Sequence, residues 1–457
     1  MKFSESWLRS FVDPACSGHE FSHLLTMAGL EIEEEASVAP AFDRVVVARI
    51  LAVDKHPGAD RLHVCRVDVG AREPLQIVCG APNAAAGCKV PCALPGAELP
   101  GGLRIKVAKV RGVDSAGMLC SARELGISDD AAGLLVLADD APVGEDIRRH
   151  LDLDDRLLTL KLTPNRADCL SLEGVAREVA ALTGSPARYT AVEEAEVTIA
   201  SRRAIVLDAP EACPRYCGRV IAGVDARAAT PAWMVRRLER SGIRPISAVV
   251  DITNYVMLEV GQPLHAFDNT RLHGAIHARM AGPAEKIRLL NEQTLELQSD
   301  ILLIADDQRP LAIGGIMGGE DSGITPESTE VFLEAAYFAP AAIAGRARRY
   351  GFASEASHRF ERGVDFAGTR RALERATRLM IDICGGQAGP VCEALACPSV
   401  RQFVCARGAP PRFSACRLRT KELPRFSRAS ICPSLVTAKS SSSLRRAIAS
   451  TSKSRRT

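Results

Sequence analysis

The chain has 457 residues, of which 47% are hydrophobic and 25% are charged, a composition typical of soluble globular proteins. At roughly 100–200 residues per domain, this length predicts about three domains. Residues 1–29 carry acids and histidines among their apolar positions, which argues against a signal peptide. No run approaches the roughly 18 uninterrupted apolar residues of a membrane span, so we expect a cytoplasmic protein without a membrane partner.

The net charge of +3 conceals an uneven distribution. From Pro398 onward there are 14 Lys and Arg residues and a single acid, Glu422, which leaves a net charge of −10 on the rest of the chain. A nucleic acid could therefore bind this acidic body only at a local basic surface, and not through a general positive field.

The chain has 15 cysteines, an odd number, and they are scattered along its length. Cys213 and Cys217 come nearest to the spacing of a zinc site, but a second pair is lacking. We expect reduced and mostly buried thiols that bind no metal.

The first 147 residues divide into a helical opening and a strand-rich region. Met1–Val38 is predicted to be helical, because Trp7, Leu8, Phe11 and Val12 recur at helical spacing, and a run of glutamates ends it. Short apolar or alternating runs then follow, separated by Gly, Pro and Asn turns. The strand candidates are Val45–Val53, Leu62–Val69, Leu75–Val78, Lys89–Leu94 and Ile105–Val110. Five short strands in about 100 residues suit a small β-barrel, of which the OB-fold is one type.

The remaining chain mixes helices and strands before its character changes. A helix is predicted over Leu172–Leu182 with Gly184 as its stop, and another over Arg370–Ile383. Strands are predicted over Ala204–Leu207 and Ile301–Ala305, so this region is typical of an α+β domain. From Pro398 the sequence is rich in Arg and Ser without amphipathic period, which predicts a disordered basic tail.

Four segments of the barrel region form a second kind of signal: Val46–Ile50, Lys55–Leu62, Gln76–Asn83 and Val110–Ser121. In this order they resemble the tRNA-binding OB module found free-standing and fused to several synthetases. A barrel face can present basic side chains to phosphates, and the candidates for tRNA binding are Lys55, Arg61, Lys109 and Arg111. Each of these taken alone is better explained as a solvated surface charge. Aromatic residues are scarce here, so recognition of tRNA shape and backbone is favoured over base stacking.

A second series of segments comprises Leu162–Asp168, Gly242–Tyr255, Gly261–Asp268, Ala312–Glu320, Phe332–Phe338, Arg348–Gly351 and Ser357–Asp365. This series is similar to the β subunit of bacterial phenylalanyl-tRNA synthetase, across its editing domain. The resemblance covers about residues 1–395. It implies a multidomain α+β protein with an N-terminal segment (1–38), an inserted OB-fold barrel (39–149), the remainder of the N-terminal domain (150–200), a B3/B4-type editing domain (201–397) and an aberrant basic tail (398–457).

The resemblance implies an editing reaction, the hydrolysis of tyrosyl-tRNA formed on the phenylalanine tRNA. Tyrosine differs from phenylalanine by one hydroxyl, so the editing site needs an acceptor for the phenolic proton. Glu334 matches the family residue assigned that role, and its apolar neighbours predict a buried carboxylate that requires a partner. That partner is a tyrosine hydroxyl or a structural cation; the residues alone do not decide between them.

Other family positions that line the editing site also match this chain. His265, Asn254, Thr253 and Arg244 are expected beside Glu334 as catalytic residues, although a histidine that only bonds the backbone is the simpler explanation of His265. The expected substrate-binding residues are Gly315, Gly318, Ser354 and Ala356. No Ser–His–Asp order stands out, so we expect an activated water and no acyl-enzyme.

The resemblance places ATP and amino-acid activation on an α subunit, with which the family forms an α2β2 ligase that also uses Mg²⁺. This chain has no GxxxxGK[ST] phosphate loop, and we expect it to bind no cofactor itself. The acidic run with which the family's β chain binds Mg²⁺ is absent after Glu422, and a frameshift would explain the tail. Two alternatives remain open: an RNA-binding protein without hydrolytic activity, and a non-functional truncated product.

Overall fold

The computed structural model describes residues 1–396, and these form two compact units. The first contains residues 1–10, 16–162 and 236–244, and the second contains the rest of the described chain. The basic tail predicted over 398–457 lies outside the described residues. None of the helices in residues 1–396 is both long and apolar enough to cross a membrane.

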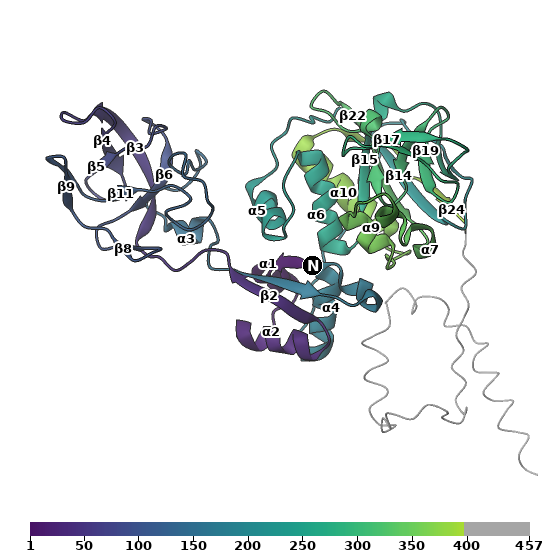
Figure 1. Cartoon of the computed structure of the whole chain (residues 1–457), viewed down its shortest axis with the longest axis horizontal. Coiled ribbons are helices and arrows are strands. Elements are labelled where there is room, and N and C mark those ends of the chain that lie inside the picture. The colour runs from purple at the N-terminus through teal and green to yellow at the C-terminus, as the bar shows by residue number, and fades with distance from the viewer. Residues whose placement is uncertain (397–457) are drawn as a thin grey trace, which may run out of the picture. The chain divides into compact units, whose positions relative to one another are not determined.

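The first unit begins with a small antiparallel sheet in the order β1-β12-β2 (Figure 1). Its strands and the neighbouring helices are β1 (Lys2–Ser4), β2 (Glu31–Ser37), β12 (Arg156–Lys161), α1 (Glu5–Phe11) and α2 (Gly18–Met27). Helix α2 starts at a capping box in which Ser17 and Glu20 satisfy each other's backbone N–H groups. The chain leaves this sheet after β2 and returns to it at β12.

The prediction that Met1–Val38 is helical was wrong at both ends, where Lys2–Ser4 forms β1 and Glu31–Ser37 forms β2. The glutamate-rich run forms strand β2, which pairs with β12 so that Glu34 lies opposite Thr159. The glutamate side chains are exposed at the edge of the sheet, where charge is tolerated and discourages pairing with other chains. Arg156 on β12 binds Glu35 at 2.5 Å and Glu5 at 3.0 Å, which offsets part of the acidic charge.

The part of the chain that connects β2 to β12 forms a five-stranded sheet in the order β11-β6-β3-β4-β5 (Figure 1). Its strands are β3 (Val45–Lys55), β4 (His63–Asp68), β5 (Leu75–Cys79), β6 (Lys89–Ala93) and β11 (Met118–Leu119). Shorter elements are β7 (Glu98–Leu99), β8 (Leu103–Arg104), β9 (Ala108–Val110), β10 (Val113–Ser115) and α3 (Ile147–His150). Four of the five predicted strands are confirmed, and of the fifth only its last three residues form a strand, β9.

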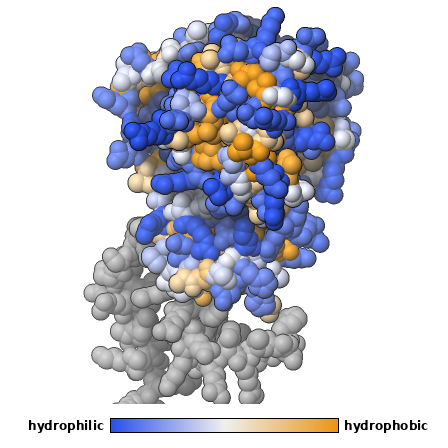
Figure 2. Space-filling model, turned by 90° about the vertical axis from the view of Figure 1, so that its left-hand side faces the viewer, coloured by the Kyte–Doolittle hydropathy of each residue, from blue (hydrophilic) through white to orange (hydrophobic). Residues whose placement is uncertain are grey.

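The sheet nearly closes into a barrel. The Ala116 N–H donates to the Gln76 carbonyl at 2.8 Å, and the Val78 N–H donates to the Ser115 hydroxyl at 3.1 Å, which joins the two edges. Inward side chains such as Ile50, Val67 and Val90 fill the interior. The outer face is mostly hydrophilic, with apolar side chains gathered near its middle (Figure 2).

The second unit contains two five-stranded sheets packed against each other. One has the order β15-β22-β14-β23, with β24 also paired to β14. Its strands are β14 (Arg215–Ala222), β15 (Leu264–Asp268), β22 (Glu330–Tyr337), β23 (Gln387–Ala388) and β24 (Cys392–Leu395). The other has the order β13-β16-β19-β20-β21. Its strands are β13 (Ile205–Leu207), β16 (Ile276–Met280), β19 (Leu302–Ala305), β20 (Pro310–Ile313) and β21 (Met317–Gly318).

The core of this unit lies between the two sheets, where side chains such as Tyr216, Phe332 and Leu302 form one buried cluster. Helices α6 (Ala248–Val260) and α10 (Thr369–Cys384) pack on the β15-β22-β14 sheet and on each other (Figure 1). Buried Arg219 on β14 binds Glu374 on α10 at 2.8 Å and so fixes the helix to the sheet. The unit is therefore mixed α+β, and the predicted fold class is confirmed at that level.

The predicted strands and helices of this unit are present. Strands β13 and β19 and helices α4 (Leu172–Thr183) and α10 fall on the predicted ranges, and Gly184 ends α4 in the left-handed conformation with φ 74°. The remaining elements of this unit are α7 (Pro340–Ile343), α8 (Arg346–Arg349), α9 (Glu355–Phe360), β17 (Lys286–Arg288), β18 (Thr294–Glu296) and the short 3-10 helices η1 (Pro164–Cys169), η2 (Asn269–Arg271) and η3 (Glu320–Ser322). Helix α5 (Ala232–Arg240) begins with residues of this unit and continues into residues of the first.

Candidate functional site

Glu334 is a carboxylate held inside the core of the second unit. It lies in the middle of β22, opposite Gly218 on β14 and His265 on β15. Side chains alternate across a strand, so Glu334 shares its face with Phe332 and Ala336, both of which belong to the cluster between the sheets. Its exposed fraction is only 7%. A carboxylate in such surroundings needs hydrogen-bonding partners.

One oxygen of this carboxylate has a partner within the protein. The hydroxyl of Tyr216, a fully buried residue of β14, donates to Glu334 Oε2 at 2.5 Å. Burial raises the pKa of Glu334 to about 7, and the Tyr216 hydrogen bond acts in the opposite direction. The same burial raises the pKa of Tyr216 well above its usual range, so its hydroxyl keeps its proton and acts as donor.

The other oxygen of Glu334 is available to a ligand. Within residues 1–396, Oε1 accepts no hydrogen bond, and it is not completely shielded from solvent. Glu334 lines a small cavity between the two sheets together with His265 and the turn after β20. The geometry therefore presents one fixed and one open carboxylate oxygen to this cavity.

His265 brings a neutral imidazole to the same cavity. Burial lowers the pKa of His265 to about 4, so the ring is uncharged at neutral pH. Its Nε2 atom is buried and has no hydrogen-bond partner in the described part of the chain. The ring meets Phe267 edge to face with 4.4 Å between the centroids, which fixes its plane. An unpaired ring nitrogen beside an open carboxylate oxygen is a second polar contact for a ligand.

Two glycines allow this close packing. Gly315 has φ +69°, a conformation that favours glycine, and a Cβ there would lie 2.8 Å from the Phe338 ring. A Cβ on Gly318 would lie 2.4 Å from His265 Cε1. Any larger residue at either position must therefore displace an aromatic or imidazole ring that borders the cavity.

Ser354 holds the glycine turn in place. Its hydroxyl donates to the Ile316 carbonyl at 2.7 Å and accepts from the Ser357 N–H at 3.0 Å, capping α9. These bonds join the turn to the first residues of α9, and Ala356 from that helix lines the cavity. The hydroxyl of Ser354 is thus already used within the protein.

The structure brings together five of the residues predicted for the site. They are Glu334, His265, Gly315, Gly318 and Ala356. The cavity that they border has a volume of about 60 Å³, room for about two water molecules. An aromatic amino acid therefore fits only if side chains at the opening turn aside.

The other three predicted catalytic residues do not line this cavity. Thr253 and Asn254 lie on α6, and the Thr253 hydroxyl donates to the Val250 carbonyl at 2.7 Å. Arg244 is exposed and belongs to the first unit. A role for these three residues stays a prediction.

The four predicted tRNA-binding residues are exposed and come from neighbouring loops at one end of the barrel. Lys55 ends β3, Arg61 lies just before β4, and Lys109 and Arg111 belong to the β9–β10 hairpin. His56 Nε2 lies 3.1 Å from the Val110 carbonyl, which ties the loop after Lys55 to that hairpin. The barrel thus gathers these separate basic positions into one region.

Sequence reasoning missed two features of the second unit. Tyr216 lies 118 positions before its partner Glu334, so no local spacing pointed to it. A larger cavity, bordered by Arg166, Arg177, Arg359 and Arg371, was not anticipated. A signal for it was the recurrence of arginine, with six in the segments Thr163–Glu178 and Ser357–Arg371 together.

The described cysteines and acids do not form a metal centre. Eight of the eleven described cysteines are buried. No group of three or more His, Cys, Asp or Glu side chains within residues 1–396 is arranged to hold a metal ion.

Two family models match the chain. The putative tRNA binding domain matches residues 45–146, which include the barrel strands. The B3/4 domain matches residues 212–385, which include Tyr216, His265, Glu334 and the glycine turn.

Similar proteins carry a common name. The phenylalanine–tRNA ligase β subunit of Dechloromonas aromatica is 69% identical over 409 residues, and that of Aromatoleum aromaticum is 63% identical over 412. Each match covers 90% of this chain and 52% of the relative, so the chain spans about half the length of the curated relatives it matches. A crystal structure of an N-terminal fragment of the Pyrococcus horikoshii phenylalanyl-tRNA synthetase β subunit is 15% identical, with a TM-score of 0.31 over 52% of this chain and 63% of that one.

Proposed function

Over the nine-tenths of its length that they match, the chain belongs to the family of phenylalanine–tRNA ligase β subunits, and from this premise we propose that it binds tRNA and hydrolyses tyrosyl-tRNA formed on the phenylalanine tRNA. The synthetic reaction, which consumes ATP and requires Mg²⁺, belongs in this proposal to an α subunit, with which the chain assembles as in the family's α2β2 enzyme. The protein then works in the cytoplasm, where tRNA is charged.

The observation that carries the proposal is the half-satisfied carboxylate of Glu334. Tyr216 holds Oε2 at 2.5 Å, and Oε1 borders the cavity without a protein partner. A tyrosine side chain that reached the cavity would offer its phenolic proton to this oxygen. A phenylalanine side chain would remove water from the same oxygen and give nothing in return.

This asymmetry supplies the selectivity that editing needs. Leaving a buried polar group unpaired costs about 1–3 kcal/mol, and more for a charged group. A site built to hydrogen-bond a substrate hydroxyl rejects the analogue that lacks it by about 10⁴–10⁵, whereas an apolar pocket rejects an added hydroxyl by only about 10². A second site around Glu334 therefore corrects what an apolar synthetic pocket admits.

Hydrolysis needs an oriented water beside the ester. Its oxygen attacks the carbonyl carbon, the bond to the ribose oxygen breaks, and the water protons end on the released tyrosine and the ribose hydroxyl. Neutral His265, with an unpaired Nε2, can hold that water or the terminal ribose, because its lowered pKa leaves a ring nitrogen free to accept. Thr253, Asn254 and Arg244 join the proposal only by family resemblance.

The barrel supplies the tRNA contact in this proposal. We take it as an OB-type module inserted between β2 and β12, with Lys55, Arg61, Lys109 and Arg111 facing the tRNA backbone. Their exposure and common location support a surface that reads phosphates and not bases. The match of residues 45–146 to a putative tRNA binding domain agrees with this role.

A deacylation assay tests the proposal against the alternative of RNA binding without hydrolysis. The full chain, alone and after mixing with the α subunit, is incubated with tyrosyl-tRNA and phenylalanyl-tRNA, and the release of each amino acid is followed. We expect rapid release of tyrosine and none of phenylalanine above the uncatalysed rate. Binding of both tRNAs without release of either amino acid, in both preparations, would favour the alternative.

A further inference from the structure

The largest cavity among those described in the second unit does not belong to the Glu334 site. Its volume is about 600 Å³, and it lies between the first turn of α4, the end of α6 and the segment that joins α9 to α10. The two cavities have no lining residue in common. We propose that this cavity binds the phosphate and ribose of a ribonucleotide.

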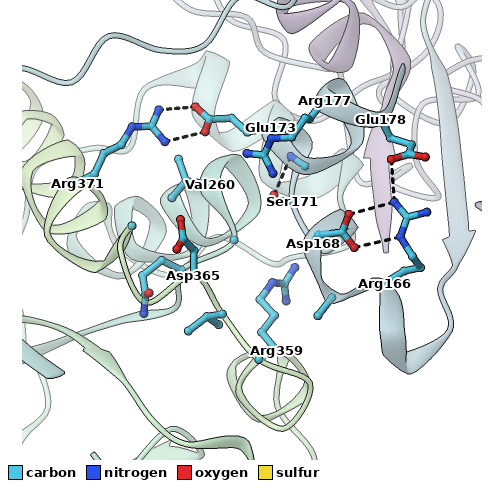
Figure 3. A pocket seen from close by; sticks show the side chains of 17 residues that line it. Arg166, Asp168, Ser171, Glu173, Arg177, Glu178, Val260, Arg359, Asp365 and Arg371 are labelled. Carbon is cyan, nitrogen blue, oxygen red and sulfur yellow. Dashed lines mark hydrogen bonds and ion pairs between the residues drawn. The ribbon is translucent and has the colours of Figure 1, made fainter. Parts of the chain in front are cut away.

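Most of the charges around the cavity neutralise one another. Arg166 binds Asp168 through two hydrogen bonds of 3.0 Å and also reaches Glu178 at 3.0 Å. Arg371 binds Glu173 through two bonds of 2.6 and 2.7 Å. These bidentate pairs (dashed in Figure 3) form walls whose charges are already paired within the protein.

Two guanidinium groups on the cavity wall keep donors to spare. Arg359 is only 1% exposed; its Nε donates to the Leu170 carbonyl and its Nη1 to Glu355, but its Nη2 has no partner within residues 1–396. Figure 3 shows this guanidinium pointing into the space between the Asp365 and Asp168 carboxylates. Arg177 lines the same space and forms no ion pair in the described chain. Arginines in this state favour a phosphate, which accepts paired N–H groups.

The start of α4 adds to this preference. Helix α4 has 12 residues, and its cap Ser171 and first-turn residues Glu173 and Gly174 line the cavity. The Ser171 hydroxyl accepts from the Gly174 N–H at 3.0 Å, so the earlier N–H groups of that turn remain without a helical partner. The positive end of the helix therefore acts together with Arg359 and Arg177 on an anion.

Asp365 distinguishes a ribonucleotide from a bare anion. Its Oδ1 accepts only from the Ala367 N–H at 2.9 Å, and no basic side chain of the described chain pairs with it. This carboxylate would repel a free phosphate but accepts hydrogen bonds from hydroxyls. A ligand with a phosphate at one end and ribose hydroxyls at the other satisfies both the arginines and the acid.

The size and lining of the cavity agree with such a ligand. Small-molecule sites usually have volumes of about 300–1,000 Å³, and 600 Å³ lies within that range. The residues that line it include no aromatic side chain, so the base is not stacked. Recognition should therefore depend on phosphate and ribose and be nearly indifferent to the base. The ribonucleotide is either a free nucleotide or one unit of an RNA chain.

Calorimetric titration of the full chain with AMP, UMP, deoxy-AMP and inorganic phosphate tests the proposal. We expect AMP and UMP to bind within threefold of each other, and deoxy-AMP and phosphate to bind at least tenfold more weakly. Arg177→Gln should weaken AMP binding at least tenfold. The control is Arg378→Gln, which makes the same charge change at an exposed position of α10 and should leave AMP binding unchanged.

Asp365→Asn and an RNA competitor complete the experiment. Asp365→Asn should reduce the difference between AMP and deoxy-AMP, because the carboxylate that accepts the ribose hydroxyls is removed. A single-stranded oligoribonucleotide that displaces AMP identifies an RNA unit as the occupant, and a failure to displace it identifies a free nucleotide. The absence of AMP and RNA binding, or equal effects of Arg177→Gln and Arg378→Gln, would overturn the proposal, whatever the outcome of the deacylation assay.

Discussion

Tyr216 decides how much of Glu334 is left for a ligand. Its hydroxyl occupies Oε2 at 2.5 Å and favours the ionised form of the carboxylate, against the effect of burial. It also prevents the carboxylate from turning both oxygens to the cavity. In the proposed editing reaction, Tyr216 contacts no substrate itself and acts on specificity by positioning the Glu334 carboxylate.

Tyr216→Phe should shift the pH dependence of tyrosine release. Without this donor the pKa of Glu334 rises further, so the carboxylate ionises and accepts the phenolic proton only at higher pH. We expect the pH profile of tyrosyl-tRNA deacylation to move upward, with a lower rate at pH 7. The control is Tyr337→Phe, on β22 itself, whose hydroxyl forms no hydrogen bond in the described chain. Identical profiles for wild type and Tyr216→Phe would exclude the positioning role.

Glu334 and His265 should have opposite effects on stability as the pH changes. The pKa of Glu334 is raised from 4.5 to about 7, so its contribution to the free energy of unfolding is full below pH 4.5 and is lost as the pH rises through 7. The pKa of His265 is lowered from 6.5 to about 4, so its contribution is full above pH 6.5 and is lost as the pH falls through 4. Between pH 4.5 and 6.5 a rise in pH therefore lowers the contribution of Glu334 to the free energy of unfolding and raises that of His265.

Glu334→Gln removes the pH-dependent contribution of Glu334 to the free energy of unfolding and leaves that of His265. We expect the free energy of unfolding of the variant, relative to wild type, to rise by about 2–3 kcal/mol between pH 4.5 and 7. Denaturant titrations at several pH values measure this difference. A difference that stayed constant over that range would mean that Glu334 titrates normally in the folded protein.

At the scale of elements, the ion pair between β14 and α10 fixes the sheet on which Glu334 lies. Arg219 and Glu374 are 2% and 4% exposed and form bonds of 2.8 and 3.2 Å, while Glu374 also accepts from the Ala195 N–H. A buried pair is costly to break, because the charge that remains is left in the interior without water or a partner to stabilise it. The exposed pair Arg227–Glu327, with exposed fractions of 67% and 70%, has a comparable distance of 3.0 Å and provides the contrast.

Glu374→Ala should destabilise the protein by about 3–5 kcal/mol. Glu327→Ala should change its stability by at most about 1 kcal/mol. Chemical denaturation of both variants at one pH gives the comparison. Equal effects would show that burial does not distinguish the two pairs.

The sequence predicted those elements whose pattern of residues is local. It did not predict elements and contacts that depend on a partner far away in the chain. Val45–Val53 and Leu172–Leu182 carry their strand and helix signals in their own residues, and both elements formed. The glutamates of β2 gave no strand signal, because the strand is specified by pairing with β12, more than 100 positions later. For the same reason, Glu334 could be found from its family motif. The roles of Tyr216 and of the unpaired Nη2 of Arg359 could not be found, because they depend on which residues the fold brings together.

At the scale of the molecule, the proposal divides the work between a barrel that binds tRNA and a domain that tests the amino acid. The division predicts that tRNA affinity and hydrolysis can be changed separately. Charge on the barrel should alter the capture of tRNA, while residues at the Glu334 cavity should alter the fate of the bound ester.

Reversing the charges of Lys55, Arg61 and Arg111 together should weaken tRNA binding and reduce its salt dependence, by about 0.7–0.9 in the logarithmic slope for each phosphate that the barrel no longer neutralises. Deacylation at saturating tyrosyl-tRNA should remain unchanged. Arg61→Glu can be matched with Arg72→Glu, because Arg72 is an exposed arginine in the loop at the opposite end of β4. Equal reductions in affinity from these two substitutions would show that the tRNA surface lies elsewhere.

The central claim is that Glu334 separates tyrosine from phenylalanine by its open oxygen. The most direct measurement is the ratio of kcat/KM for deacylation of tyrosyl-tRNA and phenylalanyl-tRNA, in the wild type and in Glu334→Ala, with the variant's fold verified by its circular dichroism spectrum and by cooperative unfolding in denaturant. The account predicts a large ratio in the wild type and the loss of most of it in the variant, through slower release of tyrosine by a factor that corresponds to a few kcal/mol. A variant that kept the wild-type ratio would contradict it.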